Sequence, residues 1–301
     1  MLGVVLRGVL GATQLCAPRY RSRRAQATLS AAMPGTAGSK KVAVVTGANK
    51  GIGWDVARIL AEQGHTTVVA ARNEELGREA TAKLQKATGS QGVLFHQLDI
   101  TDPVSVEAFA KWAAQELGEV NILVNNAGLA FKGNVFGAAE AQQTLDINLF
   151  GTRRATEALL PLVPNGGSVV NVCSMAGKLS IIKDKALRSR FENAKHADDV
   201  TALANEFVDA IKADKLAGSG WPSSMYGVSK LCEATYTRLL AEELSTLNIA
   251  VNACCPGYCA TDMSSWKGYK TSAQGADTPA WLALEAPATG KFWSERKEQP
   301  F

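Results

Sequence analysis

The sequence predicts an α/β fold, a single Rossmann-type, doubly wound parallel sheet of about seven strands with helices on both faces. Three observations support this prediction. Short apolar segments alternate with helix-length segments from about Lys41 onward. The apolar segments are almost continuously hydrophobic, as expected of strands that are buried on both faces. A glycine-rich turn directly follows the first of them and opens the first helix.

Six segments have the length and composition of buried strands, namely 42–45, 67–71, 93–98, 122–124, 168–172 and 250–254. Helix-length segments lie between them, and the clearest are 54–63, 104–117 and 139–160. Because a helix is the usual crossover between parallel strands, this order indicates repeated βαβ units. We expect the resulting domain to occupy residues 39–301.

Two segments interrupt this alternation. Residues 178–220 are rich in polar residues and have a helical pattern of their own, so we expect a helical insertion there. Asp198 and Asp199 can cap a helix in this insertion. The apolar face of that helix would consist of Val200, Leu203, Phe207 and Ile211. After about Trp266 the periodicity is weak, and we expect the end of the chain to cover the surface.

Residues 1–38 have the composition of an organelle transit peptide or of a disordered leader. The first 33 residues include Arg7, Arg19, Arg21, Arg23 and Arg24 and contain no Asp or Glu. A secretory signal fits less well, because Arg7 interrupts the apolar stretch. A used transit peptide would place the protein in a chloroplast or mitochondrion, whereas a start at Met33 would leave a cytoplasmic form.

Composition excludes several classes of partner. The formal net charge is +4, and without the five leader arginines it becomes 4 − 5 = −1, so nothing in the charge favours nucleic acid. No uninterrupted apolar run is long enough to span a membrane.

The six cysteines contain no C-x-x-C pair and lie far from the three histidines, so we expect no metal site. Cys254, Cys255 and Cys259 are expected to pack as small apolar residues in a reducing compartment.

The turn at 46–53 predicts a binding site for the pyrophosphate of a dinucleotide. Gly47, Gly51 and Gly53 would allow the backbone to turn tightly and approach a pyrophosphate at the N-terminus of the helix. Any tight strand-to-helix turn uses glycine, but a position after the first strand and before a helix is the context that a nucleotide site requires.

The end of the second strand predicts NADP(H) as the cofactor. Enzymes that use NAD place an acidic residue there to bind the ribose 2′-hydroxyl. This chain has Arg72 instead, whose guanidinium would bind a 2′-phosphate. Lys50, inside the glycine turn, would supply a second positive charge. The alternative is that Arg72 only caps the end of a strand.

Tyr226 and Lys230 stand four residues apart at the start of a predicted helix, so both lie on one face. A phenol with an ordinary pKa of about 10 is a poor acid–base group near neutrality, and an adjacent ammonium favours its anion. Such a pair alone could also be an ordinary surface contact. The sequence therefore indicates a catalytic pair only together with other residues.

Three further polar residues occur where such a site needs them. Ser174 follows the strand at 168–172, at the edge where open α/β sheets bind ligands, although it could also be a helix cap. Asn148 lies inside a predicted helix, for which Asn is a poor former. Asn125 ends the fourth strand and could also be a turn residue. The joint occurrence of these residues in this order favours a catalytic site.

With these motifs the chain resembles the short-chain dehydrogenase/reductases, and among them the monomeric NADPH-dependent carbonyl reductases of animals and their plant relatives. The resemblance runs from about Lys41 to the C-terminal region. It rests on TGANKGIG (46–53), ARN (71–73), LDI (98–100), NNAG (125–128), INLFGT (147–152), VVNVCS (169–174), GWPSSMYGVSK (220–230) and NACCPGYCATDM (252–263).

The resemblance implies reduction of ketones, aldehydes or quinones, with Tyr226 protonating the carbonyl oxygen as the nicotinamide delivers hydride. Lys230 would lower the phenol pKa and hold the ribose, and Ser174 would bind the substrate oxygen. Asn148 would position a relay water together with Lys230. The cofactor contacts implied are Gly47, Asn49, Lys50, Gly51, Ile52, Gly53, Arg72, Asp99, Asn125, Ala127, Tyr226, Lys230 and Thr261, with Asp99 reading the adenine.

The interval of 52 positions between Ser174 and Tyr226 is longer than in most of the family. The insertion would cover the helix face on which other members dimerise, so we expect a monomer. Leu76 stands where some animal members have a second basic residue, and Tyr258 replaces a frequent tryptophan. Ala176-Gly177 would limit the size of the side chains that line the pocket.

Two alternatives remain at this point. One is an oxidoreductase dedicated to a single metabolite, such as a terpenoid or alkaloid ketone, because specificity depends on the shape of the pocket. The other is a noncatalytic NADP-binding sensor or scaffold, which the same fold can support. The sensor is disfavoured because the chain keeps Asn148, Ser174, Tyr226 and Lys230.

Overall fold

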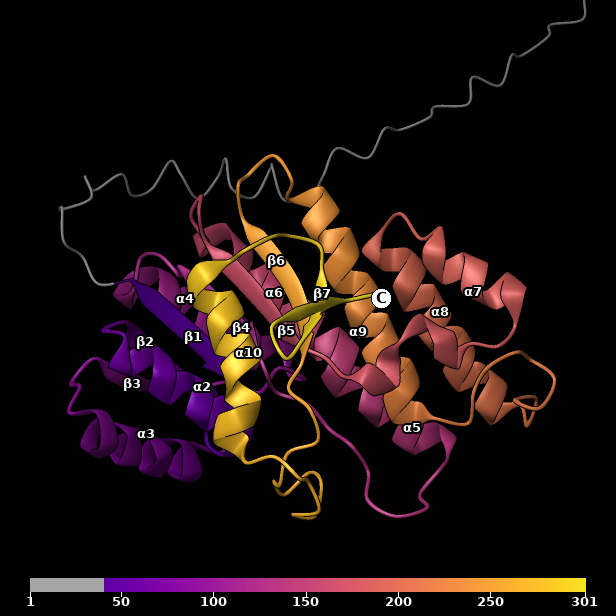
Figure 1. Ribbon diagram of the computed structural model, residues 1–301, viewed down its shortest axis with the longest axis horizontal. Coiled ribbons are helices and arrows are strands. Elements are labelled where there is room, and N and C mark those ends of the chain that lie inside the picture. Colours follow the sequence, from indigo (N-terminus) through magenta and orange to yellow (C-terminus); the bar gives the residue numbers. More distant parts are fainter. Residues whose placement is uncertain (1–40) are drawn as a thin grey trace, which may run out of the picture. The chain divides into compact units, whose positions relative to one another are not determined.

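Eight strands form one sheet in the order β3-β2-β1-β4-β5-β6-β7-β8 in the structure, a computed structural model that describes residues 41–301 (Figure 1). The strands are β1 (Val42–Thr46), β2 (Thr66–Ala71), β3 (Val93–Gln97), β4 (Ile122–Asn125), β5 (Ser168–Val172), β6 (Ala250–Cys255), β7 (Phe292–Ser294) and β8 (Lys297–Gln299). The leader expected at residues 1–38 lies outside the described residues.

The predicted parallel, doubly wound sheet is confirmed. β1 pairs in parallel with both β2 and β4, and the parallel pairing continues through β7. Every residue of β1, β4 and β5 is buried, which explains their continuous apolar composition. The strand count exceeds the expected seven because β7 and β8 form a short antiparallel pair at one edge.

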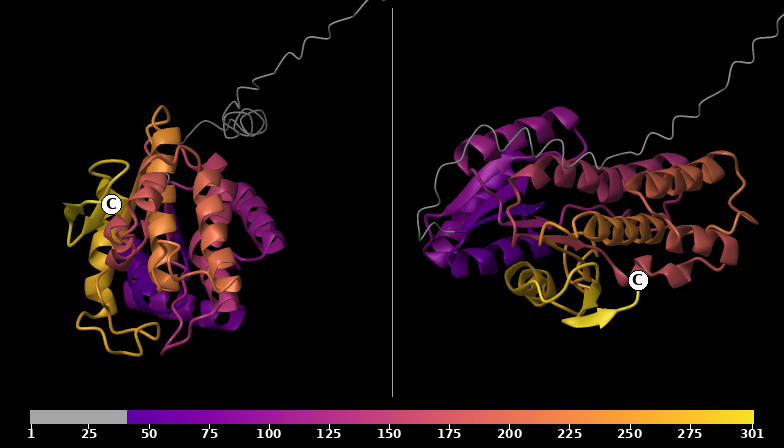
Figure 2. Two further views of the ribbon diagram at one scale, coloured as in Figure 1. Left: turned by 90° about the vertical axis from the view of Figure 1, so that its right-hand side faces the viewer. Right: turned by 90° about the horizontal axis from the view of Figure 1, so that it is seen from above.

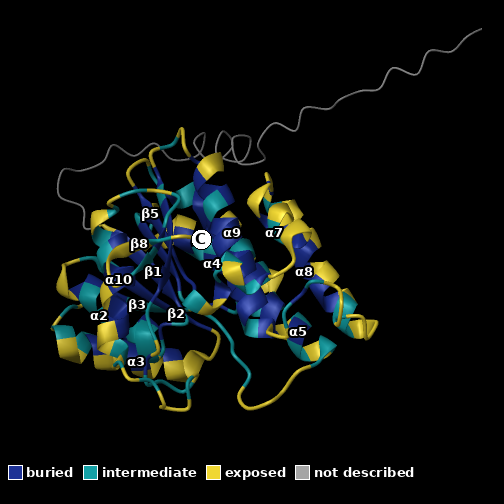
Figure 3. Cartoon of the chain, turned by 45° about the vertical axis from the view of Figure 1, so that its right-hand side comes forward, coloured by how far each residue is buried: buried dark blue, intermediate teal, exposed yellow. Residues whose placement is uncertain are grey.

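The helices cover the two faces of the sheet (Figures 1 and 2). They are α2 (Gly51–Glu62), α3 (Glu74–Thr88), α4 (Pro103–Glu116), α5 (Ala138–Leu145), α6 (Thr152–Leu159), α7 (Lys185–Glu192), α8 (Ala197–Lys212), α9 (Met225–Glu243) and α10 (Ser272–Glu285). On one face α2 packs against α3 and α10, and on the other α4 packs against α6. Figure 3 shows the buried strands enclosed by helices whose outer faces are exposed.

The single helix expected at 139–160 is divided into three parts. A π-helix, η1 (Asp146–Gly151), separates α5 from α6. Gly151 lies in this wide turn, where an added Cβ would come within 2.9 Å of Ile100 Cγ1. Periodicity could not reveal the division, because a π-helix of six residues is too short to show an apolar period of its own. The 3₁₀ helix η2 (Leu160–Leu162) follows α6.

The predicted helical insertion is present and consists of α7 and α8. Asp199 accepts hydrogen bonds from the backbone N–H groups of Lys195 and His196, so it caps α8 as expected, whereas Asp198 forms an ion pair with Arg153 instead. Val200, Leu203 and Phe207 are buried, and Ile211 is half-buried. α8 packs against α5 and α9.

The expectation that the chain after about Trp266 only covers the surface is wrong. Seven of the 14 residues of α10 are buried, and the helix packs against α2 and β5. Small residues such as Gly275 and Ala276 form its contact face, and small residues give a weak periodic signal. β7 then extends the sheet. Among the described residues, no helix is long and apolar enough to cross a membrane.

Candidate active site

The predicted site residues gather at the carboxyl ends of the central strands. The strand order reverses between β1 and β4, and ligands of open α/β sheets bind at such a switch point. The glycine turn follows β1, and Asn125–Gly128 follows β4. Ser174 follows β5. The fold therefore brings the predicted cofactor and catalytic segments to one edge.

The glycine turn is a tight cradle. Gly47 has φ +64°, and an added Cβ would lie 2.8 Å from Ala127 Cα. A Cβ on Gly53 would lie 2.3 Å from Asn126 Nδ2. In the described chain no side chain caps the N-terminus of α2, and the first turn of α2 contains no acidic residue. Its backbone N–H groups and helix dipole therefore suit an anion such as a pyrophosphate.

Two residues that the sequence analysis missed hold this cradle together. Thr46 Oγ1 accepts hydrogen bonds from the backbone N–H groups of Asn126 and Ala127, at 3.0 and 3.1 Å. The Asn126 amide donates to the carbonyl oxygens of Thr46 and Gly47. The second Asn of the NNAG motif was the available signal, since it directly follows a buried strand.

Asn125 uses its side chain in the protein interior. Its amide donates to Thr156 Oγ1 and Asn171 Oδ1, both at 2.8 Å, and Asn171 donates in turn to Thr237 Oγ1. This buried chain of polar groups links α6 to α9 across β4 and β5. The amide nitrogen of Asn125 is therefore used in the interior, whereas among the described residues its Oδ1 is buried without a hydrogen-bond partner.

The two predicted basic residues lie in different surroundings. Lys50 forms an ion pair with Asp262 in the loop after β6, and both side chains are largely exposed. This pair borders a cavity of about 280 Å³ that is also lined by Asn49, Leu76 and other residues of α2 and α3. Arg72 is exposed at the end of β2 and does not line that cavity. Lys50 and Arg72 thus follow the adjacent strands β1 and β2 at the same edge of the sheet.

The remaining predicted cofactor residues surround the turn. Thr261 contacts it, since an added Cβ on Gly51 would lie 3.4 Å from Thr261 Cγ2. Ile52 packs against the hydrophobic core. Asp99 is half-buried just after β3, and its Oδ1 accepts two hydrogen bonds from Thr101.

α9 positions the predicted catalytic pair. Ser224 caps the helix by accepting a hydrogen bond from Gly227 N–H, so Tyr226 lies in the first turn and Lys230 in the second. Lys230 is buried, and its ammonium donates to the carbonyl oxygen of Val172 at 2.9 Å. Gly177 lets the segment after β5 approach α9, because an added Cβ would lie 2.5 Å from the Leu231 nitrogen.

The Tyr226 hydroxyl lies beside both Ser174 and Lys230. Burial raises the pKa of Tyr226, and the Lys230 charge and a hydrogen bond with Ser174 partly offset this rise. Ser174 also caps the 3₁₀ helix η3 (Met175–Gly177) by accepting from Ala176 N–H. Both readings of Ser174, helix cap and site residue, are therefore compatible with its position.

Asn148 is fully buried in η1 and faces the same centre. Its amide donates to the Leu129 carbonyl oxygen and to Ser229 Oγ, and its Oδ1 accepts from Leu129 N–H. A Cβ on Gly128 would lie 3.3 Å from Asn148 Oδ1 and 3.6 Å from Lys230 Nζ. The structure therefore brings Asn148, Ser174, Tyr226 and Lys230 to one centre.

A buried carboxylate that the sequence analysis missed completes this centre. Glu233 Oε2 lies 2.6 Å from Lys230 Nζ. Burial raises the pKa of Glu233 to about 7, and Lys230 opposes this rise. The negative charge of Glu233 raises the pKa of Lys230, so the ammonium keeps its proton. The i, i+3 spacing of the two residues was the available signal.

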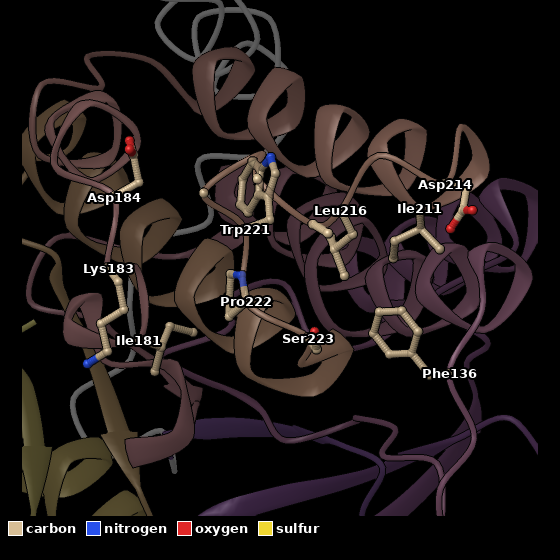
Figure 4. Close-up of a pocket in the computed structure, with 13 residues that line it drawn as sticks. Phe136, Ile181, Lys183, Asp184, Ile211, Asp214, Leu216, Trp221, Pro222 and Ser223 are labelled. Carbon is tan, nitrogen blue, oxygen red and sulfur yellow. The ribbon is translucent and has the colours of Figure 1, made fainter.

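A cavity of about 770 Å³ lies beside the N-terminus of α9 (Figure 4). Ile181, Trp221 and Leu216 come from the insertion and its flanking loops, and Phe136 comes from the loop before α5. None of the four catalytic candidates lines this cavity, but Ser223 does, three residues before Tyr226. Tyr258, one of the departures from the family pattern, is about half exposed.

The cysteines of the described part of the chain lie in its interior. Its five cysteines, Cys173, Cys232, Cys254, Cys255 and Cys259, are buried free thiols. Burial raises the pKa of Cys173 and Cys254 far above the ordinary value. Cys254, Cys255 and Cys259 are therefore buried packing groups, as expected.

Comparison with known proteins agrees with this geometry. The sequence profile of the short chain dehydrogenase family matches residues 41–197 and 217–270, and the gap between the two matches falls in the insertion. Carbonyl reductase (NADPH) 1 of Mus musculus is 40% identical over 276 residues, which cover 87% of this chain and 99% of that protein. Carbonyl reductase (NADPH) 3 of Rattus norvegicus is 40% identical over 256 residues, which cover 82% of this chain and 92% of that protein.

Solved structures of plant reductases have the same fold. Salutaridine reductase from Papaver somniferum superposes with a TM-score of 0.78 at 28% identity, covering 84% of this chain and 99% of that one. Menthone neomenthol reductase from Mentha piperita superposes with a TM-score of 0.75 at 29% identity, covering 86% of this chain and 100% of that one. With a profile match over most of its length and relatives of this similarity, the chain belongs to the short-chain dehydrogenase family.

Proposed function

We propose that the protein is an NADPH-dependent carbonyl reductase in which Tyr226 is the proton donor. The observation that carries this proposal is the position of the Tyr226 hydroxyl beside Ser174 and Lys230 at the switch point of the sheet. The names of the mammalian relatives, which are 38–40% identical, support the same reaction.

The chain has a suitable place for NADPH. The cradle at Gly47, Gly51 and Gly53 and the uncapped N-terminus of α2 fit the pyrophosphate. Lys50 beside the 280 Å³ cavity, with Arg72 at the end of β2, would hold the 2′-phosphate, and Asp99 would bind the adenine. When bound, NADPH supplies a hydride to the carbonyl carbon.

The chain's own residues would supply the proton. Tyr226 donates its phenolic proton to the substrate oxygen, and the Ser174 hydroxyl donates a hydrogen bond to the same oxygen. Lys230 has three N–H donors, and Val172 and Glu233 use two of them. Among the described residues the third donor has no hydrogen-bond partner, and it would hold the ribose or, together with Asn148, a relay water. Because burial raises the pKa of Tyr226, the donor keeps its proton at neutral pH.

Ketones, aldehydes and quinones are the proposed substrates. The 770 Å³ cavity beside α9 would receive the part of a bulky substrate that extends beyond the reacting carbonyl. A reductase dedicated to one cyclic ketone is the second candidate. The superposition with plant reductases named for salutaridine and menthone favours it as the narrower form of the same activity.

The test follows NADPH oxidation by the full chain with a panel of quinones, aldehydes and ketones, alongside Tyr226→Phe. We expect the variant to lose about 10³-fold in kcat and to keep its NADPH affinity, because it lacks only the proton donor. Tyr269→Phe, a change at a strongly exposed position, is the control. Tight NADPH binding by the parent without turnover of any carbonyl would favour the sensor.

We also propose that the protein is a monomer, because α8 of the insertion covers α5 and α9. Sedimentation velocity should give the mass of one chain, and a stable tetramer would contradict this proposal.

A further inference from the structure

Glu233 is a charged group that the proposed reaction does not use. It follows Lys230 by three residues on α9, and the Glu233 and Lys230 side chains are only 1% and 4% exposed. The carboxylate lies 2.6 Å from the ammonium on which the reaction depends. A carboxylate in this place therefore acts directly on the charge at the catalytic centre.

The groups that face this ion pair come from three elements. Tyr226 lies one turn earlier on α9, and Cys173 lies just after β5. Cys254 comes from β6 and interacts with both charges, and the neighbouring Cys255 interacts with Cys254 and Tyr226. Because burial raises the pKa of Cys173 and Cys254, these thiols add no charge. Lys230 and Glu233 are thus the charged groups whose electrostatic effect reaches the Tyr226 hydroxyl.

Packing alone does not explain the carboxylate. Among the described residues, Glu233 Oε1 is buried without a hydrogen-bond partner that meets the usual geometry, although the Cys173 thiol lies close to the carboxylate. Burying a charge costs free energy that an ion pair repays only when its remaining atoms are also satisfied. An apolar side chain would fill this space at lower cost. A role at the site accounts for the charge.

We propose that Glu233 is a positioning residue of the reductase site: its carboxylate orients the Lys230 ammonium and screens Tyr226 from that positive charge. The proposal rests on the proposed function. The ammonium alone would favour loss of the Tyr226 proton, whereas a proton donor must keep it.

The charges act on Tyr226 in opposite directions. Lys230 lowers the pKa of Tyr226, and Glu233 raises it. Removal of the Glu233 charge should therefore let Tyr226 lose its proton at lower pH. Since reduction needs the protonated phenol, the rate should fall at alkaline pH while changing little near neutrality.

The first experiment measures kcat/KM for NADPH-dependent reduction against pH in the full-length parent, Glu233→Gln and Glu233→Asp. We expect kcat/KM of the Gln variant to decline at a lower alkaline pH than that of the parent. At pH values above the start of this decline, kcat/KM of the variant should be about tenfold below that of the parent, as for the loss of one nearby charge. Glu233→Asp keeps the charge and should restore most of the parental profile. Glu242→Gln removes a carboxylate from an exposed ion pair on the same helix and is the control.

The second experiment does not depend on turnover. Tyrosine labelled with ¹³C at Cζ reports the protonation of each phenol by NMR, and Tyr226→Phe assigns the signal. We expect Tyr226 to titrate at lower pH in Glu233→Gln than in the parent or in Glu242→Gln. Glu233→Met, which fills similar space without charge, is titrated as well, so either folded variant tests the inference.

An unchanged Tyr226 titration and an equal loss of kcat/KM at every pH would show a merely structural role and overturn the inference. A parent that reduces no carbonyl would instead count against the proposed function, while the titration would still show whether Glu233 screens Tyr226.

Discussion

The glycine turn at 46–53 and the insertion at 178–220 flank the same edge of the sheet but are held in place differently. The turn depends on close approach of the main chain: Gly47 and Gly53 leave no room for a Cβ, and the Thr46 hydroxyl accepts hydrogen bonds from the main chain that follows β4. The insertion is fixed by side chains. The Trp221 ring lies 5.4 Å from Phe207 and 5.9 Å from Phe191.

This difference has a consequence for function. A site formed by backbone accepts few substitutions, which suits a cofactor that many related enzymes share. A site formed by side chains on a separate helical pair can change shape without disturbing the turn. The comparison predicts that changes in the insertion affect stability and substrate range, whereas changes in the turn affect NADPH binding.

The largest effect is expected from Phe207→Ala in the insertion. Phe207 is fully buried, so its truncation should lower the free energy of unfolding by about 3–5 kcal/mol. Urea-induced unfolding measures this, and fluorescence titration should show unchanged NADPH affinity in the folded protein. Phe136→Ala, at a position 43% exposed, is the control and should cost much less. A parallel loss of NADPH affinity would break the comparison.

Gly53→Ala tests the other region. Alanine normally stabilises a helix relative to glycine, but here the added Cβ would lie 2.8 Å from the Gly47 carbonyl oxygen. We expect the substitution to cost about 1–3 kcal/mol of free energy, as for an overpacked site. Most of this cost should appear as a tenfold or greater rise in the Kd for NADPH. Gly92→Ala, whose Cβ would meet only ordinary contacts, is the matched control. Unaltered NADPH binding would mean that the turn tolerates side chains after all.

The smallest effect is expected from Arg190→Ala, which removes an exposed ion pair between α7 and α8. Exposed pairs contribute about 0.2–1 kcal/mol. The hydrogen bond from Arg190 lowers the pKa of Glu206, so the contribution is present above the ordinary Glu value of about 4.3 and is lost as pH falls through the lower folded-state value. Unfolding curves of the variant should differ from those of the parent at neutral pH and coincide with them at acidic pH. A difference that persists in acid would point to packing instead.

The sequence was sufficient for the features that depend on local pattern. Each of the six predicted strands has ends within one residue of those observed, because an apolar run bounded by polar turns fixes a buried strand. The turn at 46–53 and the Tyr226–Lys230 pair were likewise readable, since their chemistry depends on short spacings.

Features that depend on contacts between distant segments were not readable. The interior role of Asn125 depends on Thr156 and Asn171, which no short motif connects to it. Glu233 has the spacing of an ordinary helical pair, and only the fold shows that Lys230 is buried beside it. The π-helix and the burial of α10 escaped because neither has a distinct apolar period.

The packing of α10 against α2 has a consequence for how the protein is made. Ala276, Leu282 and Ala283 belong to the same core cluster as Val45, Val56 and Leu60, so a helix near the end of the chain covers one near its beginning. During synthesis α2 emerges long before α10, and its apolar face stays uncovered until nearly the whole chain has been translated. The helix that opens the nucleotide cradle is thus made early but gains its covering partner late, so the apolar face of α2 is open to other contacts in the interval.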